Sequence, residues 1–309
     1  MASCFGRANN IDNPRIIDGR ILNYALKLKQ LGRTQETIKS QIQVLKQFAK
    51  QTDITQPEQV QNLLAELKWK NSTKNKAIRI YSQYLKFLGK QWDKPEYAKT
   101  REIAFIPTEK EIDMLITGTR RGKTAILLQL LKETAARLGE AAKLKWTNLD
   151  TKRKTIYIEA EKGSNSRILP ISDTLLAMLN TLPKKQETIF ASSKESLRRV
   201  FEVSRNRIAK RSKKPRLQKI HLHTLRHWKA TMEYHKTKDI IHVKKFLGHR
   251  SIESTMVYIN IEQALWLQST DTWTCKVAHS EQEARRLIEA GFTYVNNLGD
   301  QCALYKKLK

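Results

Sequence analysis

Cysteine is scarce in this chain and is not arranged in pairs. The three cysteines, Cys4, Cys275 and Cys302, are odd in number, and none lies in a Cys-x-x-Cys spacing. A secreted disulfide framework and a zinc ribbon both need paired cysteines, so the sequence speaks against both. The pattern predicts a protein of a reducing compartment.

Long apolar runs are also missing. The longest, around residues 125–131, is interrupted by Gln129, and it is far shorter than the roughly 20 residues that a membrane-spanning helix needs. The N-terminus carries Arg7, Asp12 and Arg15 without an apolar core, so no secretory signal is visible. We therefore expect no membrane partner and a cytoplasmic, nucleoid-associated location, or a nuclear one in a eukaryote.

Acidic residues are few relative to basic ones. The chain has 30 Asp and Glu against 58 Lys and Arg, which gives a formal net charge of +28. This imbalance fits a polyanion such as nucleic acid, although a merely solvated cationic surface would have the same composition. The hydrophobic content of 40% over 309 residues is enough to bury real cores, and the length favours two domains.

Residues 14–90 are predicted to form four short helices. Apolar residues at helical spacing follow Thr34, a suitable N-cap, and Pro57 is predicted to open the third helix. The fourth is predicted to follow Ser72 and to end at Gly89. Its polar positions form a basic face that is either solvated or packed on DNA: Lys74, Lys76, Arg79 and Lys86.

A change of character follows the helical module. Residues 91–107 lose helical periodicity and are predicted to be an interdomain linker. A capping box formed by Thr108 and Glu111 then opens a second domain, which we extend over residues 108–262.

The second domain is predicted to contain one β-hairpin among helices. A buried helix is expected at 125–136, and a short extended segment at 144–149. Residues 155–160 and 167–171 alternate like strands on either side of a turn at 162–166.

Residues 172–261 are predicted to be mainly helical, apart from a basic stretch at 210–219. This stretch, like the fourth helix, is a candidate surface for DNA phosphates. The predicted DNA-binding residues are Lys74, Lys76, Arg79, Lys210, Arg211, Lys213 and Lys214.

The last segment, residues 263–309, is predicted to be a small β-α-β-β extension. It has a strand at 272–278, a helix capped by Ser280, and two strands near 292–295 and 303–305. A unit of under fifty residues buries little surface by itself, so we expect it to dock on something. It could bridge protomers, shield the segment around Tyr258 or touch DNA, and the sequence does not choose among these.

The stretch HLHTLRH…FLGHRSIESTMVY carries the most informative residues. His223 and Arg226 stand three apart, so they share one face of a helix. His249 follows a Leu-Gly turn and precedes Tyr258 by nine residues. Each of these residues alone would more often be structural, but together, on a basic chain, they indicate a phosphodiester-cleaving site.

With these residues, the chain resembles the tyrosine recombinase, or phage integrase, family. The family's first arginine motif is matched by Arg137-Leu-Gly-Glu140 of this chain, and the family's lysine is matched by Lys162 at the hairpin turn. The residues of the motifs and the short tail look most like those of archaeal integrases and Xer-type recombinases. The chain departs from the pattern at Asn165, where many relatives carry a second basic residue. The six matched positions, in the family's order, are Arg137, Lys162, His223, Arg226, His249 and Tyr258.

The resemblance implies a mainly α fold with small β-sheets (α+β), built from a helical SAM-like core-binding domain and a catalytic domain. It also implies a site-specific recombinase that cuts and rejoins double-stranded DNA through a 3′-phosphotyrosine, as a homotetramer on paired sites and as a monomer or dimer off DNA. Integration or excision of a mobile element and Xer-like resolution fit equally. Because the intermediate conserves the bond energy, no ATP is expected. The sequence also shows no carboxylate cluster of the metal-binding type beside these residues, so we expect cleavage without a metal cofactor.

The basic groups suit a phosphodiester. Arg137 and Arg226 can clamp the nonbridging oxygens on which attack builds negative charge, and His249 can add a third donor. Glu140 is expected to orient an arginine or histidine, or to be purely structural.

The remaining groups suit proton transfer. Tyr258 is a weak nucleophile until its proton is accepted, and His223 is the candidate acceptor, or a group that positions a ligand. Lys162 is the candidate general acid for the departing 5′-hydroxyl. His227 and His242 are expected to be either structural or DNA-facing.

Two other functions are compatible with much of this pattern. A type IB topoisomerase-like enzyme would share the nucleophile but would act as a monomer and only relax supercoils. The N-terminal helical module argues against it. A DNA-binding protein that has lost catalysis is the second alternative, and the intact set of six residues argues against that.

Overall fold

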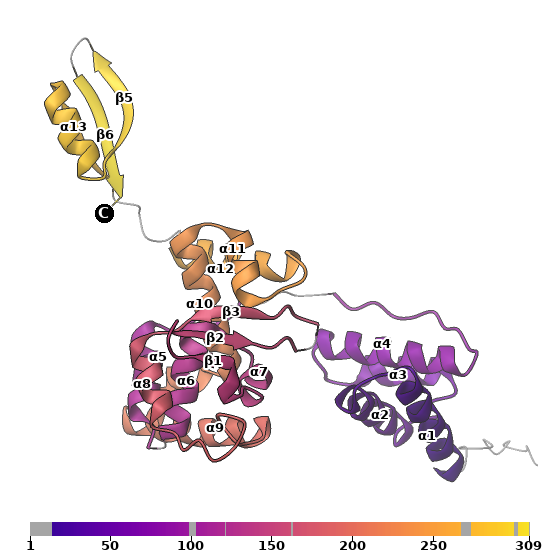
Figure 1. Cartoon of the computed structure of the whole chain (residues 1–309). Helices are drawn as coiled ribbons and strands as arrows, with labels where there is room; N and C mark the ends of the chain where they lie inside the picture. The colour runs from indigo at the N-terminus through magenta and orange to yellow at the C-terminus, as the bar shows by residue number, and fades with distance from the viewer. Residues whose placement is uncertain are drawn as a thin grey trace, which may run out of the picture. The chain divides into compact units, whose positions relative to one another are not determined.

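The computed structural model describes residues 14–98, 103–120, 122–161, 163–266, 273–299 and 302–308. The chain divides into two compact units, residues 1–102 and 103–309. The first is helical, and the second combines helices with two small antiparallel sheets (Figure 1). The predicted fold class, mainly α with small sheets, is confirmed. No helix among the described residues is long and apolar enough to cross a membrane.

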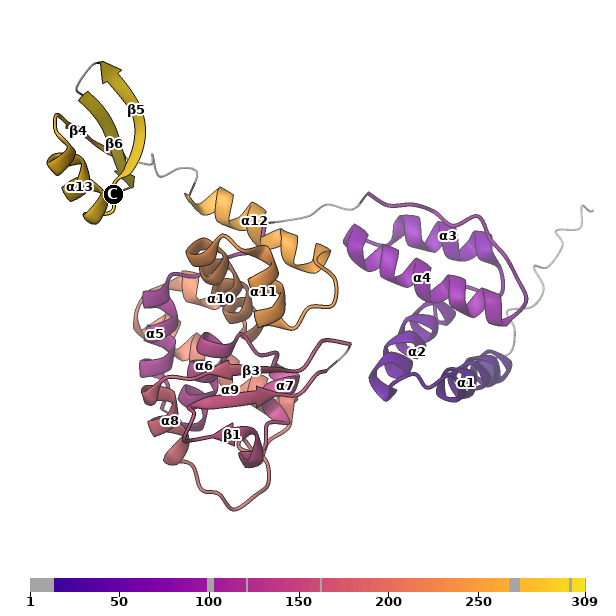
Figure 2. The ribbon, with the colours of Figure 1, turned by 45° about the horizontal axis from the view of Figure 1, so that its top comes forward.

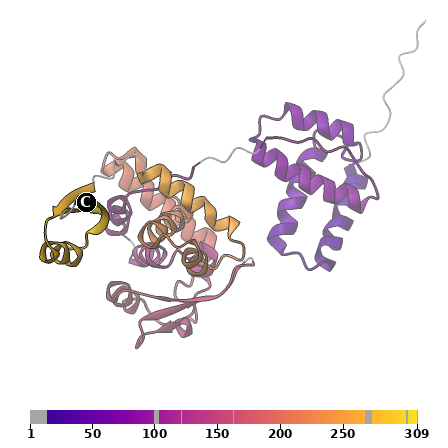
Figure 3. The ribbon, with the colours of Figure 1, turned by 90° about the horizontal axis from the view of Figure 1, so that it is seen from above.

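The first unit consists of the four predicted helices, which Figure 3 shows grouped as one bundle. Thr34 caps the second through its hydroxyl, which accepts a hydrogen bond from Thr37 N, and Pro57 opens the third. Gly89 follows the fourth with a φ of 71°, a left-handed conformation that favours glycine. One aromatic-rich core, which includes Phe48, Tyr81 and Tyr84, joins the helices. Their bounds are α1 Pro14–Gln30, α2 Gln35–Ala49, α3 Pro57–Glu66 and α4 Asn71–Phe87.

The predicted linker is largely packed onto the two units. Residues 91–98 form no helix or strand, yet Trp92 and Tyr97 pack against the core of the first unit. Trp92 Nε1 donates to Ser82 Oγ at 3.0 Å, and Asn75 Nδ2 donates to the Tyr97 carbonyl at 2.9 Å. At the other end, Ile106 is buried in the core of the second unit. Both ends of the segment are therefore anchored by tertiary contacts, which its sequence pattern did not indicate.

The predicted capping box, in which Thr108 and Glu111 exchange hydrogen bonds, opens the first helix of the second unit. The sheet of this unit, in the order β1-β2-β3, lies along one side of the helices (Figures 2 and 3). The predicted extended segment at 144–149 is wrong in part, because a 3₁₀ turn occupies Trp146–Asn148 and only Leu149–Asp150 forms strand β1. The other elements are α5 Glu109–Gly118, α6 Gly122–Thr134, α7 Leu138–Ala142, β2 Thr155–Ile158, β3 Arg167–Pro170, α8 Asp173–Asn180, α9 Lys194–Arg211, a 3₁₀ turn Pro215–Lys219, α10 Leu222–Thr237, α11 Ile240–Leu247 and α12 Glu253–Trp266.

Helix α10 occupies the centre of the second unit's packing. It contacts α6, α11 and α12, and it has buried side chains on several faces. The apolar residues of α6 form much of the same core. A helix held on several sides cannot easily rotate, so side chains on α10 have well-defined positions.

The predicted β-α-β-β order of the tail is confirmed for its described residues. The sheet order is β4-β6-β5, all antiparallel. Helix α13 has no buried residue, and the buried apolar side chains of this segment are Ala278 and Tyr305 among those described. Residue 272, the predicted start of the first strand, lies outside the described residues. The elements are β4 Trp273–Ala278, α13 Glu281–Glu289, β5 Thr293–Gly299 and β6 Cys302–Leu308.

Candidate active site

Helix α10 carries His223 and Arg226 on one face, as their spacing predicts. Arg226 is only 2% exposed. Its Nη1 donates to the Ala135 carbonyl at 2.7 Å and its Nη2 to the Leu247 carbonyl at 2.8 Å. Because a guanidinium has five N–H donors, these bonds fix its orientation and leave three donors for a ligand.

Arg137 follows α6 and stands at the N-terminus of α7. Its Nη1 lies 2.9 Å from Glu140 Oε1, and its backbone N donates to Glu140 Oε2 at 2.9 Å. The Arg137 side chain is 26% exposed, in contrast to the buried Arg226. Arg137 therefore lies at the open side of the site, with its direction set by the carboxylate of Glu140.

Glu140 also holds a third arginine, which the sequence pattern indicated only as a strand residue. Arg167 Nη2 donates to Glu140 Oε2 at 2.9 Å, and both side chains are almost completely buried. Ser164 Oγ donates to Glu140 Oε1 at 3.2 Å. The alternate burial of strand β3 points Arg167 inward, and a charged residue at an inward strand position was the signal that could have identified it.

His249 and Tyr258 come from the segment that follows α11. Gly248 ends α11 with a φ of 69°, and a Cβ atom there would lie 2.5 Å from the Asn165 carbonyl oxygen. Asn165 N in turn donates to the Gly248 carbonyl at 2.8 Å, so the hairpin turn and the α11 end are in direct backbone contact. His249 Nδ1 lies 3.0 Å from Thr255 Oγ1, which fixes the ring.

Tyr258 lies in the core, on helix α12, with 2% of its surface exposed. Its hydroxyl is 3.3 Å from Nδ1 of His227. His227 is four residues after His223, one helical turn along α10. The two rings pack edge to face, with their centroids 4.7 Å apart. The sequence motifs left His227 without a defined role, although its spacing from His223 could have placed it on the same face.

The charges of these groups act on one another. Burial, and then the charge of Arg137, lowers the pKa of Arg226 to about 10. Burial lowers the pKa of both His223 and His249 to about 4, and the charges of Arg137 and Arg226 add to the effect. Both imidazoles are therefore neutral in the free protein at neutral pH.

The pKa values of Tyr258 and Glu140 are shifted in opposite directions. Burial raises the pKa of Tyr258, although Arg226 and Arg137 act in the opposite direction, so the phenol is protonated. Burial alone would raise the pKa of Glu140, but hydrogen bonds and charge from Arg167 and Arg137 bring it below its ordinary value. Three guanidiniums thus lie around one carboxylate, and the site carries excess positive charge suited to an anion.

Lys162 lies outside the described residues. Its neighbours on both sides are described, and they tie the hairpin turn to the site. Glu161 N donates to Ser164 Oγ at 3.1 Å, and Ser164 contacts Glu140 as described above. The structure therefore brings together Arg137, His223, Arg226, His249 and Tyr258, and it anchors the turn that carries Lys162 beside them.

A hollow of about 520 Å³ opens next to Arg137 and His223. Its further charged lining includes Lys194 and Arg198 of α9, and the carboxylates of Glu161 and Glu202. Among the described residues, no group of three or more His, Cys, Asp or Glu side chains could hold a metal ion.

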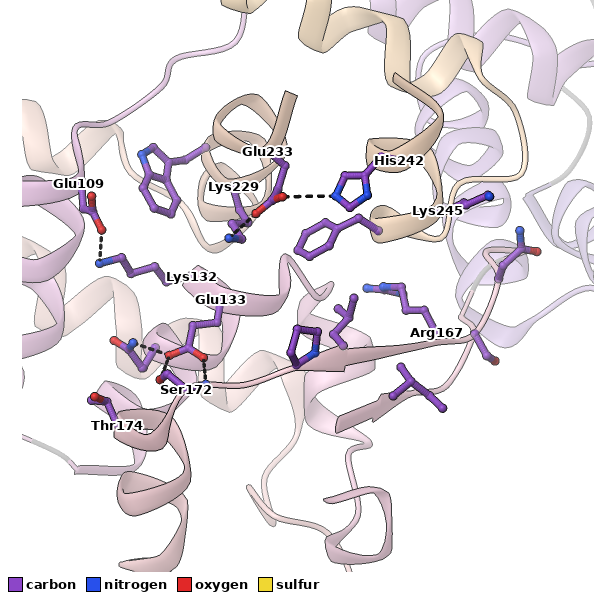
Figure 4. A pocket seen from close by; sticks show the side chains of 18 residues that line it. Glu109, Lys132, Glu133, Arg167, Ser172, Thr174, Lys229, Glu233, His242 and Lys245 are labelled. Carbon is purple, nitrogen blue, oxygen red and sulfur yellow. Dashed lines mark hydrogen bonds and ion pairs between the residues drawn. The ribbon is translucent and has the colours of Figure 1, made fainter. Parts of the chain in front are cut away.

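A larger groove, about 1050 Å³, lies between β3 and the helices α10 and α11 (Figure 4). Several of its charged groups are paired with one another. Lys229 and His242 both contact Glu233, at 2.6 and 3.4 Å, and Lys132 contacts Glu109 at 2.8 Å.

The predicted DNA-binding residues are exposed, with one exception. Lys74 is 7% exposed, its ammonium donates to the Ala65 carbonyl at 3.2 Å, and it lies over the Tyr97 ring. The prediction that Lys74 belongs to a basic surface is wrong, because its side chain is buried against the Ala65 carbonyl and the Tyr97 ring. The exposed members are Lys76, Arg79, Lys210, Arg211, Lys213 and Lys214.

Comparison with known proteins identifies the family. The model of the phage integrase family matches residues 106–264. The chain belongs to this family, and its motifs occur within the matched region.

Two curated relatives are each 24% identical. A probable integrase/recombinase of Methanocaldococcus jannaschii aligns over 207 residues, 61% of this chain and 63% of the relative. The tyrosine recombinase XerA of Pyrococcus horikoshii aligns over 270 residues, 81% of this chain and 92% of the relative. The chain thus spans less than two thirds of the first relative's length.

Solved structures show the same fold at low identity. A lambda integrase (residues 75–356) dimer bound to a COC′ core site superposes with a TM-score of 0.63 and 16% identity, covering 79% of this chain and 95% of that one. A lambda integrase tetramer bound to a Holliday junction has a TM-score of 0.58, 16% identity, and coverage of 80% and 83%.

Replacing Glu140 by Gln should destabilise the second unit strongly. The substitution leaves Arg137 and Arg167 without their buried counter-charge, and breaking a buried ion pair in this way costs about 3–5 kcal/mol. Urea unfolding of the full chain would measure the change. The control is E187Q, since Glu187 is 70% exposed and pairs with Lys145 at the surface, where such a pair is worth at most about 1 kcal/mol. Equal losses in the two variants would contradict the role of Glu140.

Replacing Arg137 by Gln should raise the pKa of His223 and His249. Removing a nearby positive charge makes protonation easier, so both values should move up from about 4. The pKa of His227 is lowered by burial and by Arg226, without a contribution from Arg137, so it serves as the internal control. NMR titration of the imidazole C–H signals would report all three. An equal rise at His227 would indicate a general loss of packing instead.

Proposed function

We propose that this protein is a site-specific DNA recombinase that forms a covalent 3′-phosphotyrosine. The observation that carries the proposal is the convergence of Arg137, His223, Arg226 and His249 with Tyr258 in one site, where the charges of the two arginines act on both histidines and on the phenol. Excess positive charge next to a protonated phenol suits the attack of that phenol on a phosphodiester.

The burial of the groups indicates how a phosphate would approach. Arg137 and His223 line the hollow, whereas Arg226 and Tyr258 are buried. A phosphodiester entering between them would receive bidentate contacts from both guanidiniums and a further contact from His249. Losing one such preorganised donor typically costs about 3–4 kcal/mol of transition-state stabilisation.

Lys162 is our candidate for the general acid. The hairpin that carries it is tied to Glu140 through Ser164 and to the α11 end through Asn165, which supports a position near the leaving 5′ oxygen. The chain's own residues thus supply the charge stabilisation and proton transfer that we propose, without ATP or a metal ion. Integration, excision and Xer-like resolution all remain within this proposal.

The partner is double-stranded DNA. The exposed basic residues of α4 and of the 210–214 segment would bind its phosphates, and a net charge of +28 supports long-range attraction. The titles of the two lambda integrase structures describe a dimer on a core site and a tetramer on a Holliday junction. They support our proposal that this chain acts as a homotetramer on paired sites. A location at the nucleoid follows from the same partner.

Covalent trapping would test the function. The full chain is incubated with sheared DNA of its host, and protein-bound fragments are recovered under denaturing conditions and sequenced. We expect adducts at a defined sequence, with the DNA linked to Tyr258, and none from the Y258F variant. Adducts scattered without sequence preference, with relaxation of plasmids, would favour a topoisomerase-like enzyme. DNA binding without any adduct would favour a binding protein that lacks catalysis.

Replacing basic residues of α4 should distinguish those that contribute to DNA binding from the one that contributes to stability. The K76A/R79A variant removes two exposed charges, so the slope of log affinity against log salt should become shallower by about 0.9 for each phosphate that is no longer neutralised. The K74M variant should leave this slope unchanged but lower stability, because the buried ammonium of Lys74 is bound to the Ala65 carbonyl. A shallower slope in K74M would contradict this assignment.

A further inference from the structure

The contact between Tyr258 and His227 gives the site a feature that its sequence motifs do not identify. The phenol hydroxyl lies 3.3 Å from His227 Nδ1, and the ring centroids are 5.8 Å apart. Among the described residues, no hydrogen bond joins the Tyr258 hydroxyl to His223, the acceptor expected from the sequence. Hydrogen bonds in a site without substrate are often long, so 3.3 Å is within reach of proton transfer after DNA binds.

We infer that His227 is the proton acceptor for the Tyr258 nucleophile. The inference rests on the proposed recombinase function and assigns one step within it. The Tyr258 proton passes to His227 Nδ1 as the phenolic oxygen bonds to phosphorus and the bond from phosphorus to the 5′ oxygen breaks. The 5′ oxygen takes a proton from the general acid, proposed to be Lys162. The phosphate remains a diester, now joined to Tyr258, and His227 becomes an imidazolium.

The protonation states in the free protein suit this role. His227 must be neutral to accept a proton, and burial and the adjacent Arg226 both keep it so by lowering its pKa. Tyr258 must hold its proton until substrate arrives, and burial favours the neutral phenol. With a phenol as donor and Nδ1 as acceptor, the His227 proton belongs on Nε2.

Substrate binding would increase the basicity of His227. The His227 ring contacts the rings of Tyr258, from α12, and of His223, from its own helix, and the charge of Arg226 acts on it. A phosphodiester bound to Arg226 would offset the positive charge that now disfavours an imidazolium. Proton transfer from Tyr258 would therefore become easier only when DNA is in place, which would keep the nucleophile unreactive in the free protein.

The test is a rate measurement on a suicide duplex built from the trapped site, nicked so that the cleaved fragment is lost. H227A should form the covalent adduct at least about tenfold more slowly than wild type, since general acid–base groups typically contribute about 10²–10⁴-fold. H227N should be slow as well, because Asn can place an acceptor oxygen near the Nδ1 position but cannot take a proton at neutral pH. The matched control is H242N. His242 lines the larger groove, where it contacts Glu233, so this variant should react as wild type does.

A duplex with sulfur in place of the bridging 5′ oxygen distinguishes the role of the proton acceptor from that of the general acid. A thiolate leaves without a proton, so this duplex should rescue K162A but leave H227A slow. A second readout needs no activity: ¹⁵N NMR of the free protein should show the Nε2–H tautomer of His227, with an Nδ1 signal that changes in Y258F.

The outcomes are distinct. A near-normal rate for H227N or H227A, rescue of H227A by sulfur, or an Nδ1–H tautomer would each overturn the assignment of His227 while the recombinase function stands. Absence of any adduct from the wild-type chain would overturn the proposed function itself, and this inference with it. Melting curves and DNA affinity equal to wild type would establish that slow variants are folded.

Discussion

The carboxylate of Glu140 is the interaction on which the arrangement of the site depends. It is completely buried, and it binds Arg137 from the start of α7 and Arg167 from strand β3. Ser164, in the hairpin turn, adds a third contact. A buried charge is costly unless it is paired and hydrogen-bonded, so these three segments are held at one point. The hairpin and the first arginine consequently occupy fixed positions before any ligand binds.

The rest of the site consists of positive charge and neutral bases. Arg226 is buried beside the backbone carbonyls of Ala135 and Leu247, which orient it without neutralising it. Burial and the charge of Arg226 keep His223, His227 and His249 neutral, and Arg137 adds to this effect at His223 and His249. This combination is unfavourable for the free protein and favourable once an anion enters. In the proposed function this anion is a DNA phosphate, and the energy of its binding would change protonation states where the reaction takes place.

Features encoded by local pattern could be predicted from the sequence, and those that depend on tertiary partners could not. The caps at Thr34 and Thr108 and the β2–β3 hairpin follow from short-range rules, and the structure contains all three. Spacing also predicted that His223 and Arg226 share a face of α10. By contrast, the sequence pattern of α4 gives no sign that Lys74 is buried, because its partners, the Ala65 carbonyl and the Tyr97 ring, come from other segments.

Arg167 and His227 illustrate the same limit at the site. A strand arginine and a histidine next to a motif arginine have no defined partner in the sequence. Their roles appear only when Glu140 and Tyr258 are brought to them by the fold. The position of Lys162 stays a prediction, since that residue lies outside the described part of the chain.

Gly248 has a consequence for how this site could evolve. Because even a methyl group at this position would meet the Asn165 carbonyl, the loop preceding His249 and the hairpin loop fit together without spare room. A mutation that enlarges residue 248 would separate two loops to which we assign different chemical roles, the proposed general acid Lys162 on one and His249 on the other. Insertions or deletions in either loop would then be tolerated only with a matching change in its counterpart, so the two loops are expected to vary in concert.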